Sequence, residues 1–349
     1  MKKIKLLHIV FVSTLMLFSC SKQEISYCDD DAPLYVGADF PIGAAISTDL
    51  LQTNEKYRSI TRKQFNRISG EQAWLLYRVH PHREIYDWRD YDTLVQFAER
   101  HNQDVVGHSL IYHDWLPYWL NEFSGSKKEL EAIMKDHIQT IVSRYKGKIG
   151  TWIVVNEAFN EDGTLRKSIW HKYIGPSYIA KAYKWAHEAD PDAKLFYNDY
   201  NLALNRNKLN AVLRLLKTFK ENDVPVHGLG CQLHIFREFP EVAEINEMAL
   251  KVQQNDLLVY YSEIDISLNV YGKHTHPTND LLMSQKQILK GVVNGYKRLD
   301  SKYQYGISFW NIGDADTWIR YSFNRNDWPC MWDDHYEPKP MYCGIKEAL

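Results

Sequence analysis

The sequence predicts a single (β/α)8 barrel, in which eight parallel strands are each followed by a helical or irregular segment. From residue 33 onward, short β-rich runs alternate with amphipathic segments, and this alternation is typical of parallel βαβ units. The alternation repeats over roughly 310 residues, which suits a closed barrel better than an open sheet. No Pro/Gly-rich linker follows residue 33, so a second domain is not expected.

The predicted strands are short runs rich in β-branched and aromatic residues. In chain order they are Ile42–Ile46, Gln64–Ser69, Asp104–Ser109, Thr151–Asn156, Lys194–Asn198, Gly228–Leu233, Leu257–Asp265 and Tyr305–Trp310. The segments between them have helical periodicity and a charged face, and are predicted as helices at Tyr91–Arg100, Lys127–Tyr145, Ser177–Ala189, Lys208–Glu221, Pro240–Gln254 and Ser284–Leu299. Ser126 and the pair Pro176-Ser177 are start signals for two of these helices.

The composition is that of a folded globular protein with an unusually high aromatic content. Hydrophobic residues make up 45% of the 349 residues and charged residues 25%, which excludes a largely disordered chain. The formal net charge is only −2, so nucleic acid is not an expected partner. The 11 Trp and 23 Tyr residues exceed what a core usually needs, and flat aromatic rings are good surfaces for stacking on ligands.

The first residues indicate export rather than a part of the fold. Lys2, Lys3 and Lys5 precede an apolar run over Ile9–Phe18, which is too short to span a bilayer and resembles a signal-peptide core. The run ends in Leu-Phe-Ser-Cys, which resembles a bacterial lipobox and implies a lipid on Cys20. We therefore expect a signal peptide at 1–19, a flexible tether at 20–32 and a barrel at 33–349. The protein would be anchored to a bacterial membrane, on the surface or the periplasmic face of the outer membrane; a cleaved, unlipidated signal peptide is the alternative.

The spacing of the remaining cysteines indicates no metal site, and the sequence lacks the common motifs for binding a nucleotide cofactor. Cys28, Cys231, Cys330 and Cys343 form no C-x-x-C pair, so a zinc or redox site is not expected. Cys330 and Cys343 either pair after export or remain buried, idle thiols. The first strand is followed by Ser-Thr-Asp in place of a glycine-rich phosphate loop, and the chain has no P-loop, no H-E-x-x-H and no G-x-S-x-G motif.

Polar and aromatic side chains gather where the predicted strands end, which is where barrels carry their active sites. Two carboxylates stand out because each lies in a run too apolar to leave a carboxylate there by chance: Glu157 ends Trp-Ile-Val-Val-Asn-Glu, and Glu263 lies within Leu-Val-Tyr-Tyr-Ser-Glu-Ile-Asp. A buried carboxylate costs free energy unless a partner or a function compensates. A structural salt bridge could explain either residue alone, but two at the mouth of one barrel indicate a site.

Paired carboxylates beside aromatic residues suit the hydrolysis of glycosidic bonds. One carboxyl group protonates the leaving oxygen, and the other attacks the sugar or activates water. A separation of about 5–5.5 Å gives retention of configuration, and a wider one gives inversion. The sequence supplies the pair and leaves the separation open.

Several segments resemble the signatures of glycoside hydrolase family 10, whose best-known members are endo-1,4-β-xylanases. The resemblance extends in order from Phe40 to Tyr342 and is carried by Phe40–Ala45, Gly107–Leu110, Trp152–Ala158, Asn198–Asn201, Gln232–His234, Glu263–Asp265 and Pro338–Pro340. It implies hydrolysis of internal β-1,4-xylosidic linkages by a monomeric enzyme that needs no cofactor, with xylan-type polysaccharide or oligosaccharide as its partner.

The resemblance also implies residue roles. Glu157 would be the general acid/base and Glu263 the nucleophile. The substrate-binding residues would be Glu71, Gln72, His108, Asn156, Tyr200, Gln232, His234, Trp310 and Trp318, with Asp265 and Asn198 in support. Independently of the resemblance, the apolar context of Trp74 predicts a core position, and Trp328 and Trp332, in the loop after the last strand, are candidates for the cleft wall.

The sequence departs from the family pattern on one side of the cleft. Glu-Asn-x-Met-Lys-Trp is usual after the second strand, but this chain has Gln72 and Leu75 in place of the asparagine and the lysine. After the third strand a sugar-binding glutamine is replaced by Trp115. Three hypotheses stay open: an ordinary xylanase, an enzyme with remodelled glycone subsites for decorated xylan or another β-linked glycan, including exo action, and a non-catalytic glycan-binding lipoprotein.

Overall fold

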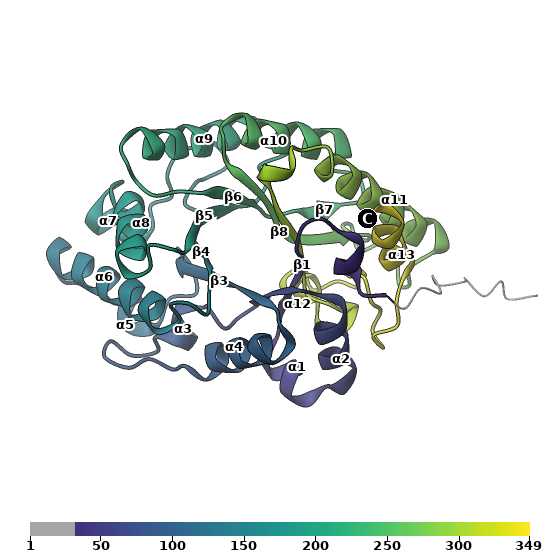
Figure 1. Cartoon of the computed structure of the whole chain (residues 1–349), viewed down its shortest axis with the longest axis horizontal. Helices are drawn as coiled ribbons and strands as arrows, with labels where there is room; N and C mark the ends of the chain where they lie inside the picture. Colours follow the sequence, from purple (N-terminus) through teal and green to yellow (C-terminus); the bar gives the residue numbers. More distant parts are fainter. Residues whose placement is uncertain (1–31) are drawn as a thin grey trace, which may run out of the picture.

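Residues 32–349 form a closed barrel of parallel strands surrounded by helices, in the computed structural model drawn in Figure 1. The strands are β1 (Ile42–Ile46), β2 (Arg67–Gly70), β3 (Asp104–Ile111), β4 (Thr151–Asn156), β5 (Lys194–Asp199), β6 (Gly228–Cys231), β7 (His234–Phe236), β8 (Leu258–Ser267) and β9 (Gln304–Trp310). The ring closes where β9 pairs with β1 and β6 pairs with β8. The predicted fold class is confirmed.

The strand predicted at Gly228–Leu233 is divided in the structure. β6 ends at Cys231, and the chain resumes as β7 at His234, which pairs with Asp265 near the end of β8. β6 and β7 together occupy one position of the eight-stranded ring. The break between them turns Gln232 and His234 toward the barrel mouth, where both line the cleft described below.

The six predicted helices are present, with ends that differ by a few residues. They are α4 (Arg89–His101), α6 (Lys127–Arg144), α8 (Tyr178–Ala189), α9 (Arg206–Glu221), α10 (Val242–Gln254) and α11 (Asn279–Tyr296), and they lie outside the strands in Figure 1. The predicted start signal at Ser126 is confirmed, because its hydroxyl accepts a hydrogen bond from the Glu129 amide.

Further helical segments were not predicted. They are the 3-10 turns η1 (Leu34–Gly37), η2 (Ser301–Tyr303) and η3 (Asp314–Asp316) and the helices α1 (Thr48–Thr53), α2 (Glu55–Gln64), α3 (Leu76–Val79), α5 (Tyr118–Asn121), α7 (Ile169–Ile174), α12 (Trp318–Phe323) and α13 (Pro340–Ala348). The predicted strand at Gln64–Ser69 was wrong at its start, because Gln64 is the last residue of α2. Most of α2 is polar and its apolar stripe is short, so periodicity indicates this helix weakly.

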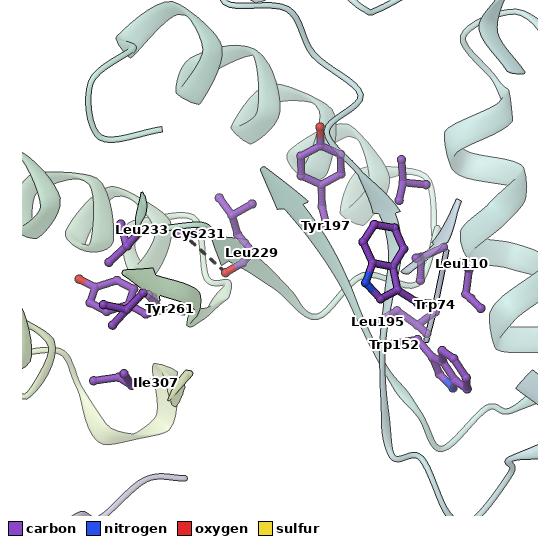
Figure 2. Close-up of a cluster of buried hydrophobic side chains, with 14 of the residues drawn as sticks. Trp74, Leu110, Trp152, Leu195, Tyr197, Leu229, Cys231, Leu233, Tyr261 and Ile307 are labelled. Atoms are coloured by element: carbon purple, nitrogen blue, oxygen red, sulfur yellow. Dashed lines mark hydrogen bonds between the residues drawn. The ribbon is translucent and has the colours of Figure 1, made fainter. Parts of the chain in front are cut away.

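Two groups of apolar side chains hold the barrel together. The larger fills the space between strands and helices, and Figure 2 shows part of it, including Trp152 and Tyr261. The smaller lies inside the barrel and consists of Val106, Ile153, Phe196 and Tyr260. Below it the buried Arg67 places its guanidinium 4.5 Å from the centre of the Tyr305 ring. The barrel interior is therefore a packed core that supports the mouth and is not a channel.

The backbone of β3 approaches β4 so closely that only glycine fits at position 107. A Cβ atom on Gly107 would lie 2.1 Å from the Trp152 ring. The buried indole therefore occupies the space that any other side chain at position 107 would need. Because His108 follows directly, this contact also helps to position a residue of the cleft.

The expectations for the N-terminus lie outside the described residues. The signal peptide, the lipidated Cys20 and nearly all of the tether therefore stay predictions. Among residues 32–349, no helix combines the length and apolarity that crossing a membrane requires. Cys231 and Cys330 are free and buried, so Cys330 does not pair with Cys343. Cys343 is disulfide-bonded and is therefore not an idle thiol.

Candidate active site

A cleft of about 1150 Å³ opens at the carboxyl ends of the strands. It is lined by Glu157, Glu263 and every side chain predicted to bind substrate, namely Glu71, Gln72, His108, Asn156, Tyr200, Gln232, His234, Trp310 and Trp318. The two predicted supporting residues, Asn198 and Asp265, lie behind this wall and are buried. The barrel thus brings together residues that are spread over about 250 positions of the sequence because all of them follow strands that end at one mouth.

Glu157 is held at the end of β4 by its backbone and by three side chains. Its backbone has a φ of 53°, in the left-handed region, and its amide donates a hydrogen bond of 2.9 Å to the carbonyl of Asn198. The carboxyl group accepts hydrogen bonds from Gln232 Nε2 at 3.0 Å, Tyr112 Oη at 3.2 Å and Asn156 Nδ2 at 3.2 Å. A non-glycine residue in this conformation is uncommon and persists where the surroundings hold it.

The environment of Glu157 favours its protonated form. Burial raises the pKa of Glu157 to about 7, and the negative charges of Asp199 and Glu263 add to this effect, while the hydrogen bonds from Gln232 and Tyr112 oppose it. Near neutral pH the group is therefore poised to hold or release a proton. A carboxyl group tuned in this way suits general acid/base chemistry.

Glu263 in β8 is surrounded by donors and imidazoles. Asn198 Nδ2 donates a hydrogen bond of 2.7 Å to Oε1, and His234 Nε2 lies 3.3 Å from Oε2. His108 Nε2 lies 3.6 Å from Oε1, and burial lowers the pKa of His108. These contacts fix the direction of the carboxyl group, as attack on carbon requires.

His234 connects Glu263 to a second carboxylate. Its Nδ1 lies 2.9 Å from Asp265 Oδ2, and the same oxygen accepts a hydrogen bond of 2.7 Å from Trp318 Nε1. Burial lowers the pKa of His234, but the charge of Asp265 and the hydrogen bonds to Asp265 and Glu263 outweigh it and raise the pKa to about 10. The imidazole is therefore a cation at neutral pH, and it lies beside the Glu263 carboxyl group.

Two amide side chains connect the carboxylates through hydrogen bonds. Asn156, which contacts Glu157, accepts a hydrogen bond of 2.8 Å from Asn198 Nδ2, and that amide nitrogen also contacts Glu263. The Asn198 side-chain oxygen, Oδ1, accepts a hydrogen bond from the Ser262 hydroxyl. Asn198 is fully buried, so the amide cannot turn away without leaving polar atoms unpaired.

The walls of the cleft are largely aromatic, but two of the tryptophans considered for them lie elsewhere. Trp74 is buried and belongs to the apolar core, as expected, and it also lines the cleft, where its ring centre lies 4.8 Å from that of His108. The ring centre of Trp310, which also lines the cleft, lies 5.6 Å from that of His108. Trp328 and Trp332, the two candidates for the cleft wall, do not line the cleft; both are buried among apolar side chains.

Several functional candidates escaped the sequence reasoning. Tyr112 contacts Glu157 directly, and Arg166 Nε donates a hydrogen bond of 2.9 Å to the Glu157 carbonyl while its NH2 group contacts the Tyr200 hydroxyl. Lys208 is fully buried, and its Nζ lies 3.6 Å from the centre of the Tyr200 ring. The signal for Tyr112 was its place just after a strand end, while Lys208 lies in an ordinary amphipathic helix.

Glu71 and Gln72 lie on the side of the cleft away from Tyr200. In the ring, β2 is adjacent to β1 and β3, whereas β5, which precedes Tyr200, lies across from it. Burial raises the pKa of Glu71 to about 7, and burial also raises that of the neighbouring Asp316 to about 7. The Gln72 side chain accepts a hydrogen bond of 3.0 Å from Arg78.

The family model for glycosyl hydrolase family 10 matches residues 34–348. This chain belongs to glycosyl hydrolase family 10. Endo-1,4-beta-xylanase B of Thermotoga neapolitana is 34% identical over 345 residues, covering 96% of each chain.

Solved structures agree with this assignment. Native xylanase 10B from Thermotoga maritima has a TM-score of 0.85 at 34% identity, covering 90% of this chain and 96% of that one. Native xylanase 10C from Cellvibrio japonicus has a TM-score of 0.87 at 30% identity, covering 92% and 73%. The predicted family is thus confirmed for this glycoside hydrolase.

Proposed function

We propose that this family 10 hydrolase cleaves internal β-1,4-xylosidic linkages of xylan with retention of configuration. The observation that carries the proposal is the contrast between two carboxyl groups lining one cleft. Burial and neighbouring negative charge raise the pKa of Glu157 to about 7, whereas Glu263 is surrounded by donors and a cationic imidazole. The choice of xylan is supported by the names of most of the similar proteins, which are xylanases, although one of them is named an exoglucanase.

In the first step Glu263 is the nucleophile and Glu157 the acid. A carboxylate oxygen of Glu263 forms a bond to the anomeric carbon as the bond from that carbon to the glycosidic oxygen breaks. Glu157 gives its proton to the departing oxygen, so that the leaving chain is a neutral alcohol. The enzyme then holds a covalent glycosyl ester on Glu263 and an ionised Glu157.

In the second step the same residues act in reverse. Glu157 takes a proton from water as the water oxygen attacks the anomeric carbon, and the bond to the Glu263 oxygen breaks. Two inversions give net retention, and both carboxyl groups return to their starting states. Asn156 would donate to the sugar hydroxyl next to the anomeric carbon, an interaction that strengthens as positive charge develops on the ring.

The experiment uses a chromogenic aryl β-xylobioside, xylan and three proteins. Wild type should cleave both substrates, and the proton NMR spectrum should first show the β-anomer of the product. Glu263→Ala should lose both activities. Glu157→Ala should lose activity on xylan but still form the covalent intermediate with the aryl substrate, whose leaving group needs little protonation.

Two results would contradict the proposal. An α-anomer as the first product would replace double displacement by single displacement with inversion. Binding of xylan by wild type without any cleavage of either substrate would favour the non-catalytic, glycan-binding hypothesis. Glu122→Ala, which changes an exposed carboxylate outside the cleft, is the control for unspecific effects of removing a charge.

We further propose that the protein is exported and carries a lipid on Cys20. The support is the order of three features in the sequence: basic residues, a short apolar run and Leu-Phe-Ser-Cys. Incorporation of labelled palmitate into wild type, and its loss in Cys20→Ala, would test the anchor. A soluble, unlabelled wild-type protein in the culture medium would contradict it.

A further inference from the structure

Cys343 is disulfide-bonded, and the candidates for its partner can be narrowed by elimination. The chain contains five cysteines, at positions 20, 28, 231, 330 and 343. Cys343 lies in α13 and takes part in a disulfide, whereas Cys231 and Cys330 are free. A partner from the same chain is therefore Cys20 or Cys28, and both precede the described residues.

The described chain begins beside α13. The Leu34 amide donates a hydrogen bond of 3.2 Å to Gln64 Oε1, and the Tyr342 hydroxyl donates one of 3.2 Å to the same oxygen. Leu34 and Gln64 are buried, so this contact fixes the place where the N-terminal segment joins the barrel. Figure 1 shows the purple start of the described chain next to α13. The residues that follow Cys28 thus reach the barrel beside the immediate neighbour of Cys343.

Two arguments favour Cys28 over Cys20 as the partner. Cys28 precedes Leu34 by six residues and Cys20 precedes it by fourteen. The cost of closing a loop rises with its length, so the shorter segment closes about 3- to 4-fold more readily. Cys20 is also the proposed lipid carrier, and a sulfur that holds a lipid in a thioether has no thiol left to oxidise. The second argument rests on the proposed lipid anchor, and the first does not.

We infer that Cys28 and Cys343 form a disulfide that fastens the N-terminal segment to α13. One S–S bond replaces two S–H bonds as the two thiols lose two protons and two electrons. The electrons reduce the disulfide of an oxidising exchange partner, which leaves as a dithiol. Such bonds form and persist in the oxidising compartments outside the cytosol, which agrees with the proposed export.

The bond shortens the connection between the barrel and the lipid. From Cys20 to the buried Leu34 the extended chain reaches roughly 46–50 Å, whereas from Cys20 to Cys28 it reaches only roughly 26–29 Å. Residues Pro340–Ala348 of α13 do not line the cleft. The disulfide therefore holds the barrel close to the membrane through a part of the surface that leaves the cleft accessible to a polysaccharide.

Peptide mapping tests the bond itself. The full chain is purified from membranes with its free thiols blocked, digested without reduction and compared with a reduced sample. A peptide that contains Cys28 should be linked to one that contains Cys343, and fragment ions should place the link on Cys343 rather than on Cys330. A link to Cys20, to Cys330 or to a second copy of the chain would overturn the inference, and so would an unlinked Cys28.

Cys28→Ser and Cys343→Ser measure the contribution of the bond to stability. Each should lower Tm by about 3–10 °C, the range expected when a disulfide that closes a long loop is lost. The double variant should be no less stable than Cys343→Ser, because a single bond can be lost only once. Cys20→Ser, measured in the same detergent, is the matched control and should keep the Tm of wild type. A normal Tm in Cys28→Ser, or fully additive effects, would contradict the inference.

A protease site inserted into the full-length protein tests the connection to the membrane. When the site lies between Asp30 and Asp31, the cut protein should stay on the membrane until a reductant is added, because Cys28 still joins the lipid-bearing piece to α13. When the site lies between Gln23 and Glu24, cutting alone should release the barrel. Release of the first protein without a reductant would overturn the inference.

The inference and the proposed function fail in different ways. Loss of the disulfide in wild type leaves the hydrolysis of aryl β-xylobioside unaffected, and a chain that cannot hydrolyse this substrate can still show the linked peptides. A wild-type protein without a lipid would overturn the anchor, and peptide mapping would then still decide between Cys28 and Cys20.

Discussion

The ammonium group of Lys208 lies 2.9 Å from the carboxylate of Asp199, and neither side chain is exposed to solvent. The pair lies behind Glu157 and Tyr200. Tyr197 Oη also donates a hydrogen bond of 2.6 Å to Asp199, and the amide of Ala158 donates to the same Tyr197 oxygen. The segment that carries the proposed acid/base is thus tied to a buried charge.

Replacing Asp199 by asparagine should shift the pH profile of hydrolysis. The negative charge of Asp199 contributes to the raised pKa of Glu157, so Asp199→Asn should lower that pKa. Glu157 must be protonated to act as the acid, and the alkaline limb of kcat/KM should move to lower pH by roughly 0.5–1 unit.

The control for this shift is Glu161→Gln. Glu161 is the second carboxylate bonded to Lys208, at 3.0 Å, but it is half-exposed and has no part in the raised pKa of Glu157. Its replacement should leave the limb in place. An unchanged profile in Asp199→Asn would contradict the electrostatic role assigned to Asp199.

Gly230→Ala should lower kcat although residue 230 does not line the cleft. A Cβ atom on Gly230 would lie 2.3 Å from Asn198 Oδ1, so the amide that bonds to Glu263 must move. A misplacement of about 1 Å near reacting groups costs on the order of 100-fold in rate. We expect kcat to fall by about 10- to 100-fold with little change in KM.

Gly150→Ala is the matched control for Gly230→Ala, because a Cβ atom at position 150 would meet nothing within 4 Å. Steady-state kinetics of both variants and a crystal structure of Gly230→Ala would check the prediction. Normal kcat in Gly230→Ala would show that the position of Asn198 does not matter.

Glu71→Gln should stabilise the protein at alkaline pH. Burial raises the pKa of Glu71 from 4.5 to about 7, so between these values the folded state binds more protons at this site than the unfolded state. The free energy of unfolding therefore falls as pH rises from about 4.5 to 7. The neutral amide removes this loss, and Tm at pH 8 should rise by about 1–3 °C.

At pH 4 the same substitution should bring no such gain, since the carboxyl group is then protonated in both states. Glu84→Gln, whose side chain is 89% exposed, is the control. Calorimetry at the two pH values checks the prediction. A gain in Tm at pH 4 equal to that at pH 8 would show that ionisation of Glu71 is not its cause.

Many residues of the candidate active site could be predicted to lie together because they follow strand ends. Glu157 and Glu263 interrupt apolar runs, and a parallel barrel collects its strand ends at one mouth. The polar partners of these carboxylates were harder to predict. Tyr112 and Arg166 reach Glu157 from irregular segments, and in such segments periodicity does not indicate which way a side chain points.

Local pattern also failed where long-range packing decides. The apolar context of Trp74 correctly predicts its core position but does not indicate that the same ring also lines the cleft. The predicted sixth strand is divided, and its second part pairs with the end of β8 through His234. By itself the sequence determined the alternation of strands and helices, the two interrupting carboxylates and the family, because these depend on residue order alone. Only the tertiary structure decided which hydrogen bonds set the pKa of Glu157 and which aromatic rings remain exposed, because desolvation and contact depend on neighbours that are distant in the chain.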